Sequence, residues 1–75
     1  MKYTVLFFTH SGAIKFERKM KARGIELILK PVPRQLSSNC GICAELVYES
    51  LPQELIDDEV EKIFDESLKV VYDAE

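Results

Sequence analysis

The chain has 75 residues, of which 47% are hydrophobic and 31% charged, and its formal net charge is −3. This length allows one domain over residues 1–75, and the composition is that of a globular protein rather than a disordered chain. The longest strongly apolar run, Val5-Leu6-Phe7-Phe8, is too short to span a bilayer, and its surroundings do not form a signal peptide. We therefore expect a cytoplasmic protein with no membrane partner.

Charge is distributed unevenly along the chain. Residues 1–44 contain eight Lys or Arg and two acidic residues, a balance of +6, whereas residues 45–75 contain two Lys and eleven acidic residues, a balance of −9. Two neighbouring helices of opposite charge explain this asymmetry most simply, because runs of charge are usually solvated helix faces. A basic site beside an acidic docking surface is the alternative.

The first part of the chain predicts a strand, a helix and a second strand. Residues 3–9 (YTVLFFT) are aromatic and β-branched, which is typical of a buried strand. Ser11 is the candidate N-cap of a helix that Gly24 ends. The apolar stripe of this helix consists of Ala13, Phe16 and Met20. Residues 25–29 (IELIL) form the second predicted strand, which the prolines at 31 and 33 stop.

A loop and a third strand are expected next. Residues 31–42 show no apolar period, which predicts a loop with a short turn at residues 34–36. Residues 43–48 (CAELVY) alternate between apolar and polar side chains, which predicts a strand.

The last part of the chain predicts a second helix and a final strand. Ser50 with Gln53 resembles a capping box. The apolar or small residues that then recur at helical spacing are Ile56, Val60, Ile63 and Ser67. Residues 68–73 (LKVVYD) form the final predicted strand.

The order βαββαβ in so short a chain is the ferredoxin-like, or split βαβ, pattern. It predicts an α+β fold in which both helices cover one face of an antiparallel sheet. The third strand then lies between the first two and runs antiparallel to both. In this arrangement four chain positions meet at one edge of the sheet: the end of the first strand, the start of the first helix, the end of the second strand and the start of the third strand. The residues expected as neighbours at that edge are His10, Ser11, Gly12, Arg34 and Cys40.

The two cysteines, Cys40 and Cys43, stand three positions apart in the segment SSNCGIC. A disulfide is disfavoured because cytoplasmic thiols are normally reduced and so short a loop gains little entropy from closure. One CxxC supplies two of the four ligands of a structural zinc site, and His10 alone cannot complete the set, so no metal or other cofactor is expected. The thioredoxin CxxC opens a helix, whereas this one opens a strand. Two inert, buried cysteines remain an alternative.

Cys40 is the better candidate for a reactive thiol because its neighbours in SSNCG are polar or small. A helix N-terminus or a nearby cation lowers a thiol pKa from about 8.5 to roughly 3.5–7.5, and the predicted edge offers the start of the first helix, Arg34 and, if protonated, His10. Gly41 lets the backbone approach closely or adopt a positive φ, so that backbone N–H groups can surround a group bound to Cys40. Cys43 lies within a strand and is expected to be either a resolving thiol or a buried hydrophobe.

Simpler roles exist for several of these residues. His10 after a strand is often a capping or hydrogen-bonding residue, and Arg34 can be a solvated loop cation rather than an anion-binding group. The aromatic residues of the first strand resemble the stacking surface of an RNA-recognition domain. No RNP1-like run follows them and the chain is acidic, so nucleic acid is not an expected partner.

The segment GIELILKPVPRQLSSNCGI resembles a selenium/sulfur carrier-like family of small domains. The family pattern is a strand ending in P-x-P-R, then serines, and then Cys-Gly opening the next strand. The residues that meet it are Pro31, Pro33, Arg34, Ser37, Ser38, Cys40 and Gly41. The opening FFTHSGAIKFERKMKARGI and the ending KVVYDAE also fit the family. The resemblance implies that Cys40 carries sulfur or selenium as a persulfide or selenopersulfide. Cys43 departs from the pattern, and as a resolving thiol it could discharge a bound persulfide as a disulfide.

These features predict a relay protein rather than a complete enzyme. Cys40, the more acidic and more exposed thiol, would take sulfur or selenium from a donor protein and pass it to an acceptor protein. Arg34 and the backbone near Ser11 and Gly12 would stabilise the terminal atom. One alternative is a non-catalytic interaction module with a structural CxxC that forms a homodimer or docks through its sheet. The other alternative is a thiol-redox protein that uses Cys40 and Cys43.

Overall fold

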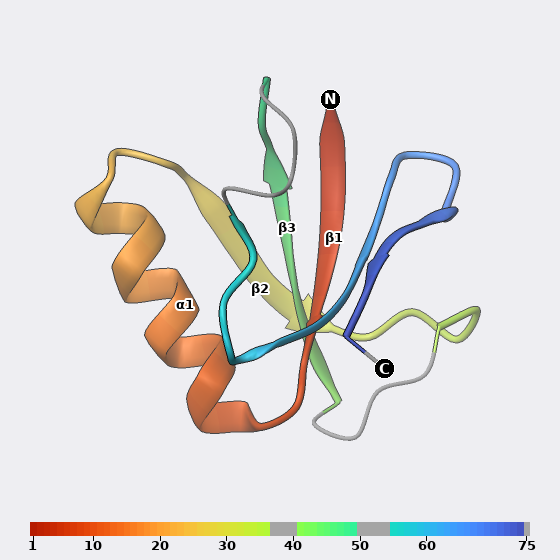
Figure 1. The fold of residues 1–75 in the computed structure, drawn as a ribbon, viewed down its shortest axis with the longest axis horizontal. Helices are drawn as coiled ribbons and strands as arrows, with labels where there is room; N and C mark the ends of the chain where they lie inside the picture. The colour runs from red at the N-terminus through yellow and green to blue at the C-terminus, as the bar shows by residue number, and fades with distance from the viewer. Residues whose placement is uncertain (37–40, 50–54, 75) are drawn as a thin grey trace.

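The structure is a computed structural model that describes residues 1–36, 41–49 and 55–74. Its elements, in chain order, are β1 (Lys2–Phe7), α1 (His10–Ala22), β2 (Leu27–Pro31), β3 (Ile42–Val47), β4 (Val60–Phe64) and β5 (Val70–Asp73). The strands form one sheet in the order β2-β3-β1-β4-β5, with every neighbouring pair antiparallel. Figure 1 shows α1 beside the half of the sheet that contains β2, β3 and β1. No helix in these ranges is long and apolar enough to cross a membrane.

The first part of the chain folds largely as its periodicity predicts. β3 lies between β1 and β2 and is antiparallel to both, and Gly24 follows α1 with a positive φ of 77°. The N-cap prediction is wrong. Thr9 caps α1, since its Oγ1 accepts the N–H of Gly12 at 2.9 Å, whereas Ser11 lies exposed within the first turn. Pro31 ends β2 without disturbing the ladder, because β2 is an edge strand.

The ferredoxin-like prediction is wrong for the second part of the chain. α1 is the one α-helix among the described residues, and β4 stands where the second helix was expected. A turn precedes β4, in which the Asp57 carbonyl accepts the N–H of Val60 at 3.2 Å and Asp57 Oδ1 accepts the N–H of Glu59 at 2.8 Å. The predicted capping box of Ser50 and Gln53 lies outside the described residues. The result is a five-stranded sheet covered by one helix.

A β-bulge explains the helical spacing in this region. Leu6 of β1 pairs with Lys62 and Phe7 pairs with Val60, so Glu61 is an extra residue in β4. In a regular strand, residues three apart point to opposite faces. The bulge shifts this phase by one residue, and Val60 and Ile63 consequently both join the core on the α1 side. Their i, i+3 spacing is the spacing of a helix, although it arises here in a strand.

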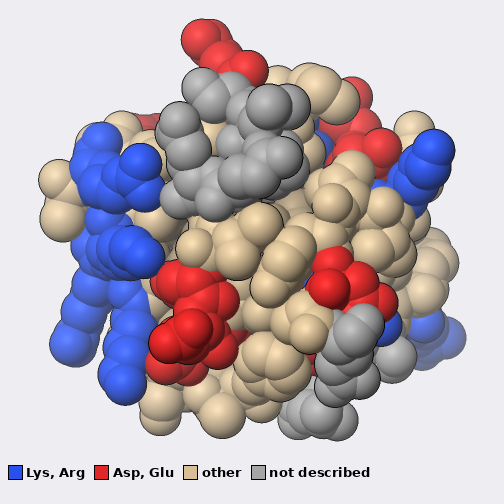
Figure 2. Space-filling view, in the orientation of Figure 1, with Lys and Arg blue, Asp and Glu red and all other residues tan. Residues whose placement is uncertain are grey.

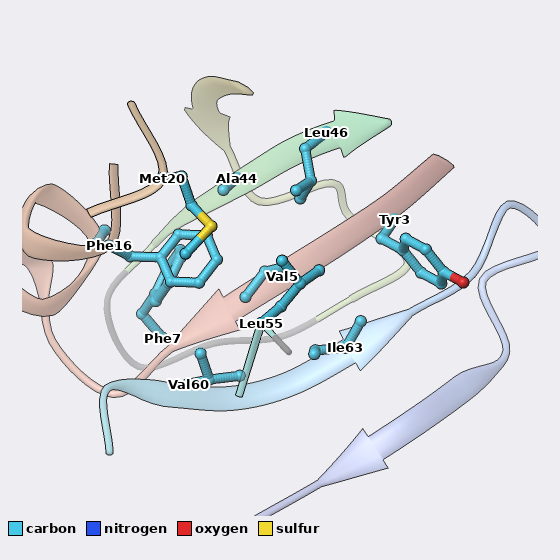
Figure 3. Close-up of a cluster of buried hydrophobic side chains, with 11 residues drawn as sticks. Tyr3, Val5, Phe7, Phe16, Met20, Ala44, Leu46, Leu55, Val60 and Ile63 are labelled. Carbon is cyan, nitrogen blue, oxygen red and sulfur yellow. The ribbon is translucent and has the colours of Figure 1, made fainter. Parts of the chain in front are cut away.

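Side chains alternate between two buried clusters on the two faces of the sheet. The fully or nearly buried residues on the α1 side are Tyr3, Val5, Phe7, Ala13, Phe16, Met20, Ala44, Leu46, Leu55, Val60 and Ile63. Figure 3 shows them converging between α1 and the sheet, where the rings of Phe7 and Phe16 lie 5.1 Å apart between centroids. The cluster on the other face is much smaller and consists of Leu6, Cys43 and Phe64. Most of the apolar burial therefore lies under α1.

The basic and acidic segments of the chain are neighbours in space. Lys19 of α1 forms an ion pair with Asp57 at 3.2 Å, and Lys15 lies 4.0 Å from a carboxylate oxygen of Glu59. Figure 2 shows Lys and Arg side chains along the side of the molecule that α1 occupies, with acidic side chains next to them. The acidic partner of α1 is thus the turn before β4 rather than a second helix. Such partly exposed pairs each contribute little to stability.

Candidate functional site

The candidate site is the connection between β2 and β3, which carries the P-x-P-R…C-G segment. Pro31 pairs with Ile42 across the β2–β3 ladder, and Cys43 pairs with Leu6 of β1. The end of β1, the end of β2 and the start of β3 therefore lie at one end of the sheet, at the bottom of Figure 1. The N–H of Val32 donates to the carbonyl of Gly41 at 3.1 Å and closes the base of the connection.

The first part of this connection folds back over the sheet. The N–H of Leu36 donates to the Pro33 carbonyl at 3.0 Å, which confirms the turn predicted at residues 34–36. Val32 and Leu36 pack against the small cluster on the face opposite α1. Arg34 lies at the exposed tip of the turn and makes no hydrogen bond or ion pair with any residue that the structure describes.

Cys43 lies beneath this cover with none of its surface exposed to solvent. Its Sγ lies 3.8 Å from the carbonyl oxygen of Pro31, and it packs with Leu6 and Phe64. The sequence did not determine which face of the sheet Cys43 occupies. It occupies the face opposite α1. Cys40, Ser37 and Ser38 lie outside the described residues, so the greater exposure expected of Cys40 stays a prediction.

Gly41 adopts a φ of +72°, which is one of the two roles expected of it. It is exposed, and a Cβ atom added to it would meet no atom within 4 Å. Space therefore does not require glycine here, and only the left-handed backbone does. The chain enters β3 through this residue directly after Cys40.

The start of α1 lies on the other face of the sheet from this connection. Phe7 packs with the core under α1, whereas the preceding residue, Leu6, packs with Val32 and Leu36. Successive residues of a strand point to opposite faces. The structure thus places Arg34, Gly41 and Cys43 around the connection on one side, and His10, Ser11 and Gly12 at the start of α1 on the other.

The start of α1 also has anionic and capping groups of its own. His10 and Ser11 are exposed, and the N–H of Gly12 is occupied by Thr9 Oγ1. A Cβ on Gly12 would clash with Oε2 of Glu59, which shows how closely this carboxylate approaches the first turn. A carboxylate is the group that a helix N-terminus favours. Glu59 therefore places a negative charge beside the first turn of α1.

A charged cluster beside Cys43 was not predicted from the sequence. Lys30 is the cross-strand partner of Cys43, and its Nζ donates to Glu45, which also accepts from Lys2 Nζ at 3.0 Å. The hydrogen bonds from Lys30 and then Lys2 lower the pKa of Glu45, and the bond to Glu45 raises the pKa of Lys30. The signal was the opposite charges on three neighbouring strands, with Lys2 in β1, Lys30 in β2 and Glu45 in β3. Across residues 1–36, 41–49 and 55–74, no three His, Cys, Asp or Glu side chains are grouped to hold a metal ion.

Comparison with known protein families identifies a family model that matches most of the chain. The family model described as "Putative Se/S carrier protein-like" matches residues 2–67, which include every described element except β5. No curated protein and no solved structure matches the chain. The matched range contains the whole P-x-P-R…C-G segment that carried the resemblance. The chain belongs to this Se/S carrier-like family.

Proposed function

We propose that the protein is a sulfur or selenium carrier in which Cys40 is the carrier thiol. The Cys40 thiolate attacks the terminal sulfur of a persulfide on a donor protein. A new S–S bond forms on Cys40, the S–S bond of the donor breaks, and the donor leaves as a thiolate. A nucleophile of the acceptor protein then attacks the terminal atom and releases the Cys40 thiolate. Selenium would follow the same route as a selenopersulfide.

The observation that carries this proposal is the family match across the P-x-P-R…C-G segment. Arg34 supports it because its guanidinium is exposed on the same connection and has no partner among the described residues. A guanidinium hydrogen-bonds and stabilises a nearby anion, which here is the thiolate or the terminal atom of the persulfide. Because Glu59 lies at the start of α1 and that helix covers the other face, we assign the anion-stabilising role to Arg34 and not to His10, Ser11 or Gly12.

We assign Cys43 a secondary role. As a resolving thiol, its thiolate would attack Sγ of the Cys40 persulfide, form a Cys40–Cys43 disulfide and release hydrosulfide. Burial of Cys43 beneath Val32 and Leu36 opposes this reaction until the cover opens. In the closed state Cys43 packs the cover against the sheet, and the carried atom stays on Cys40.

Intact-mass spectrometry after incubation with a persulfide donor tests the proposal. Wild type and Cys43→Ser should each gain one sulfur atom, or one selenium atom from a selenium donor, and Cys40→Ser should gain none. Loading of Cys40→Ser, or no loading of wild type, would show that Cys40 is not the carrier. Loss of two hydrogen atoms from wild type with release of hydrosulfide, absent from Cys43→Ser, would establish the resolving reaction.

Two matched pairs of variants test the groups that support Cys40. Arg34→Ala should slow alkylation and loading of Cys40, whereas Arg18→Ala removes an equally exposed cation from α1 and should leave both rates unchanged. Gly41→Ala and Gly24→Ala impose the same strain, about 1–2 kcal/mol, because both glycines have a positive φ and neither has an atom near its Cβ position. Only Gly41→Ala should slow loading. Equal slowing by both members of either pair would remove that group from the proposal.

A further inference from the structure

β2 is an edge strand, and its outer side carries unpaired backbone groups. The N–H of Val32 donates to Gly41, which makes these two residues a hydrogen-bonded pair of the β2–β3 ladder. The unbroken register then alternates, so that Ile28 and Lys30 direct their backbone groups to β3. Leu27 and Leu29 direct theirs to the outside, and they have no partner there among the described residues.

The stretch of β2 with unpaired outward backbone groups is limited at both ends. On one side, the N–H of Ile25 is used by the Met20 carbonyl at 2.9 Å. On the other side, Pro31 has no N–H to offer. The outward N–H and C=O groups of Leu27 and Leu29 remain, which is enough to pair with one short antiparallel strand.

On the face opposite α1, the side chains of β2 and of the residue before it can pair with the same side chains of a second copy. Ile28 is 65% exposed, and it stands midway between Glu26 and Lys30. If two copies of β2 pair antiparallel about a twofold axis at Ile28, each Ile28 faces Ile28 of the partner subunit, and each Glu26 faces Lys30 of the partner subunit. Apolar and opposite-charge pairs of this kind stabilise a sheet. Leu27 and Leu29 then exchange about four backbone hydrogen bonds with the same residues of the second copy.

We propose that the protein forms a homodimer in which the β2 edges pair antiparallel, centred on Ile28, so that one sheet continues through both copies. A hollow of about 720 Å³ beside the start of β2 is lined mainly by apolar groups, and its charged lining residues are Lys2, Glu26, Glu45 and Glu49. In the dimer, the partner's Lys30 lies next to Glu26 at the border of this hollow. The charges of the edge thus favour a second copy as its occupant.

The other edge of the sheet is less suited to pairing. β5 could also place Lys69 opposite Asp73 of the partner subunit, with Val71 at the centre. The β4–β5 register shifts between Ile63 and Phe64, which leaves Val71 as an extra residue in the strand. Bulges twist an edge away from a flat partner and are a common protection of edge strands. β2 has no such bulge.

Stacking of two open sheet faces is also disfavoured. The ion pairs of Glu45 with Lys2 and Lys30 lie on this face, next to the exposed Ile28. Removing these charges from water would cost more than their mutual attraction returns. Edge pairing keeps them in solvent.

Disulfide trapping tests the geometry of the interface. Residue 28 would face its copy as a non-hydrogen-bonded pair, with the Cα atoms about 4.5 Å apart, which a disulfide can span. In a Cys40→Ser, Cys43→Ala background, Ile28→Cys should form a covalent dimer on mild oxidation. Val71→Cys on β5 and Val47→Cys, which is equally exposed on the open face of β3, should remain monomeric under the same conditions. Preferential cross-linking of either control would overturn the proposal.

Charge reversal tests the register by analytical ultracentrifugation, with circular dichroism to verify folding. Glu26→Lys and Lys30→Glu should each raise the dimer dissociation constant at least about tenfold, because two like-charge pairs replace two opposite-charge pairs. Mixing the two variants should restore dimers, since every residue 26 then meets an opposite charge. Wild type that stays monomeric at the highest soluble concentration, or a mixture that stays monomeric, contradicts the proposal. A monomeric wild type that binds an extended peptide along β2 would instead identify the edge as a peptide-docking site.

Discussion

The two faces of the sheet differ in what covers them. α1 covers one face over β2, β3 and β1, and eleven residues form the main buried cluster on that face. On the opposite face three buried residues, Leu6, Cys43 and Phe64, are covered by Val32 and Leu36 of the β2–β3 connection. The rest of that face carries the Lys2–Glu45–Lys30 ion pairs and exposed apolar side chains, Val47 and Ile28 among them.

The part of the protein that should set its stability therefore lies on one face of the sheet, and the proposed site lies on the other. Burial of apolar surface drives folding, so the face under α1 should dominate the free energy of unfolding. The opposite face is where the β2–β3 connection attaches, and we expect its cover of two partly buried residues, Val32 and Leu36, to open without unfolding the sheet.

The largest effect is expected under α1. Phe16→Ala should lower the free energy of unfolding by about 3–5 kcal/mol, because Phe16 is fully buried and packs against Phe7. Urea titration followed by circular dichroism measures this loss. Ile14→Ala on the outer side of α1, where the side chain is exposed, should change stability by less than about 0.5 kcal/mol. A Phe16→Ala loss no greater than that of Ile14→Ala would show that α1 does not hold the main core.

A smaller and local effect is expected on the opposite face. A half-buried leucine such as Leu36 contributes about 1 kcal/mol, so Leu36→Ala should increase opening of the cover roughly fivefold. In a Cys40→Ser background, the rate of Cys43 alkylation measures this opening. Gln35→Ala, an exposed change in the same turn, should leave the rate unchanged. If alkylation of Cys43 rises only in proportion to global unfolding, the cover does not open on its own.

The contrast between the faces also explains which parts of the fold were readable from the sequence. The stripe of Ala13, Phe16 and Met20 and the apolar run of β1 are local patterns, and both predicted their elements. The spacing of Val60 and Ile63 led to the wrong prediction of a helix, because a β-bulge gives these two strand residues the i, i+3 spacing of a helix. A bulge depends on the partner strand, so periodicity within the segment could not reveal it.

The site was predictable to the same limited degree. Strand order fixed the end of the sheet at which Arg34 and Gly41 lie, and the glycine at 41 correctly indicated a positive φ. Strand order did not fix the face, and for this reason the start of α1 and the β2–β3 connection were expected together. The face of Cys43 follows from its register with Leu6 and Lys30. Register is a property of three strands together, and a single segment does not contain it.

The smallest effect should come from the charges on the open face, and it should depend on pH. The pKa of Glu45 is lowered by its bonds to Lys30 and Lys2, so its contribution to stability is present above its ordinary pKa of 4.5 and is lost as pH falls through the lower value in the folded protein. The pKa of Lys30 is raised by Glu45, so its contribution is present below 10.5 and is lost as pH rises through the higher folded value.

Glu45→Gln should therefore reduce thermal stability at neutral pH by less than Leu36→Ala does, because the three side chains are 22–52% exposed and solvent screens them. The deficit should vanish in strong acid and shrink in strong alkali. A Glu45→Gln deficit that is constant from acid to alkali would mean that the ion pairs do not stabilise this face.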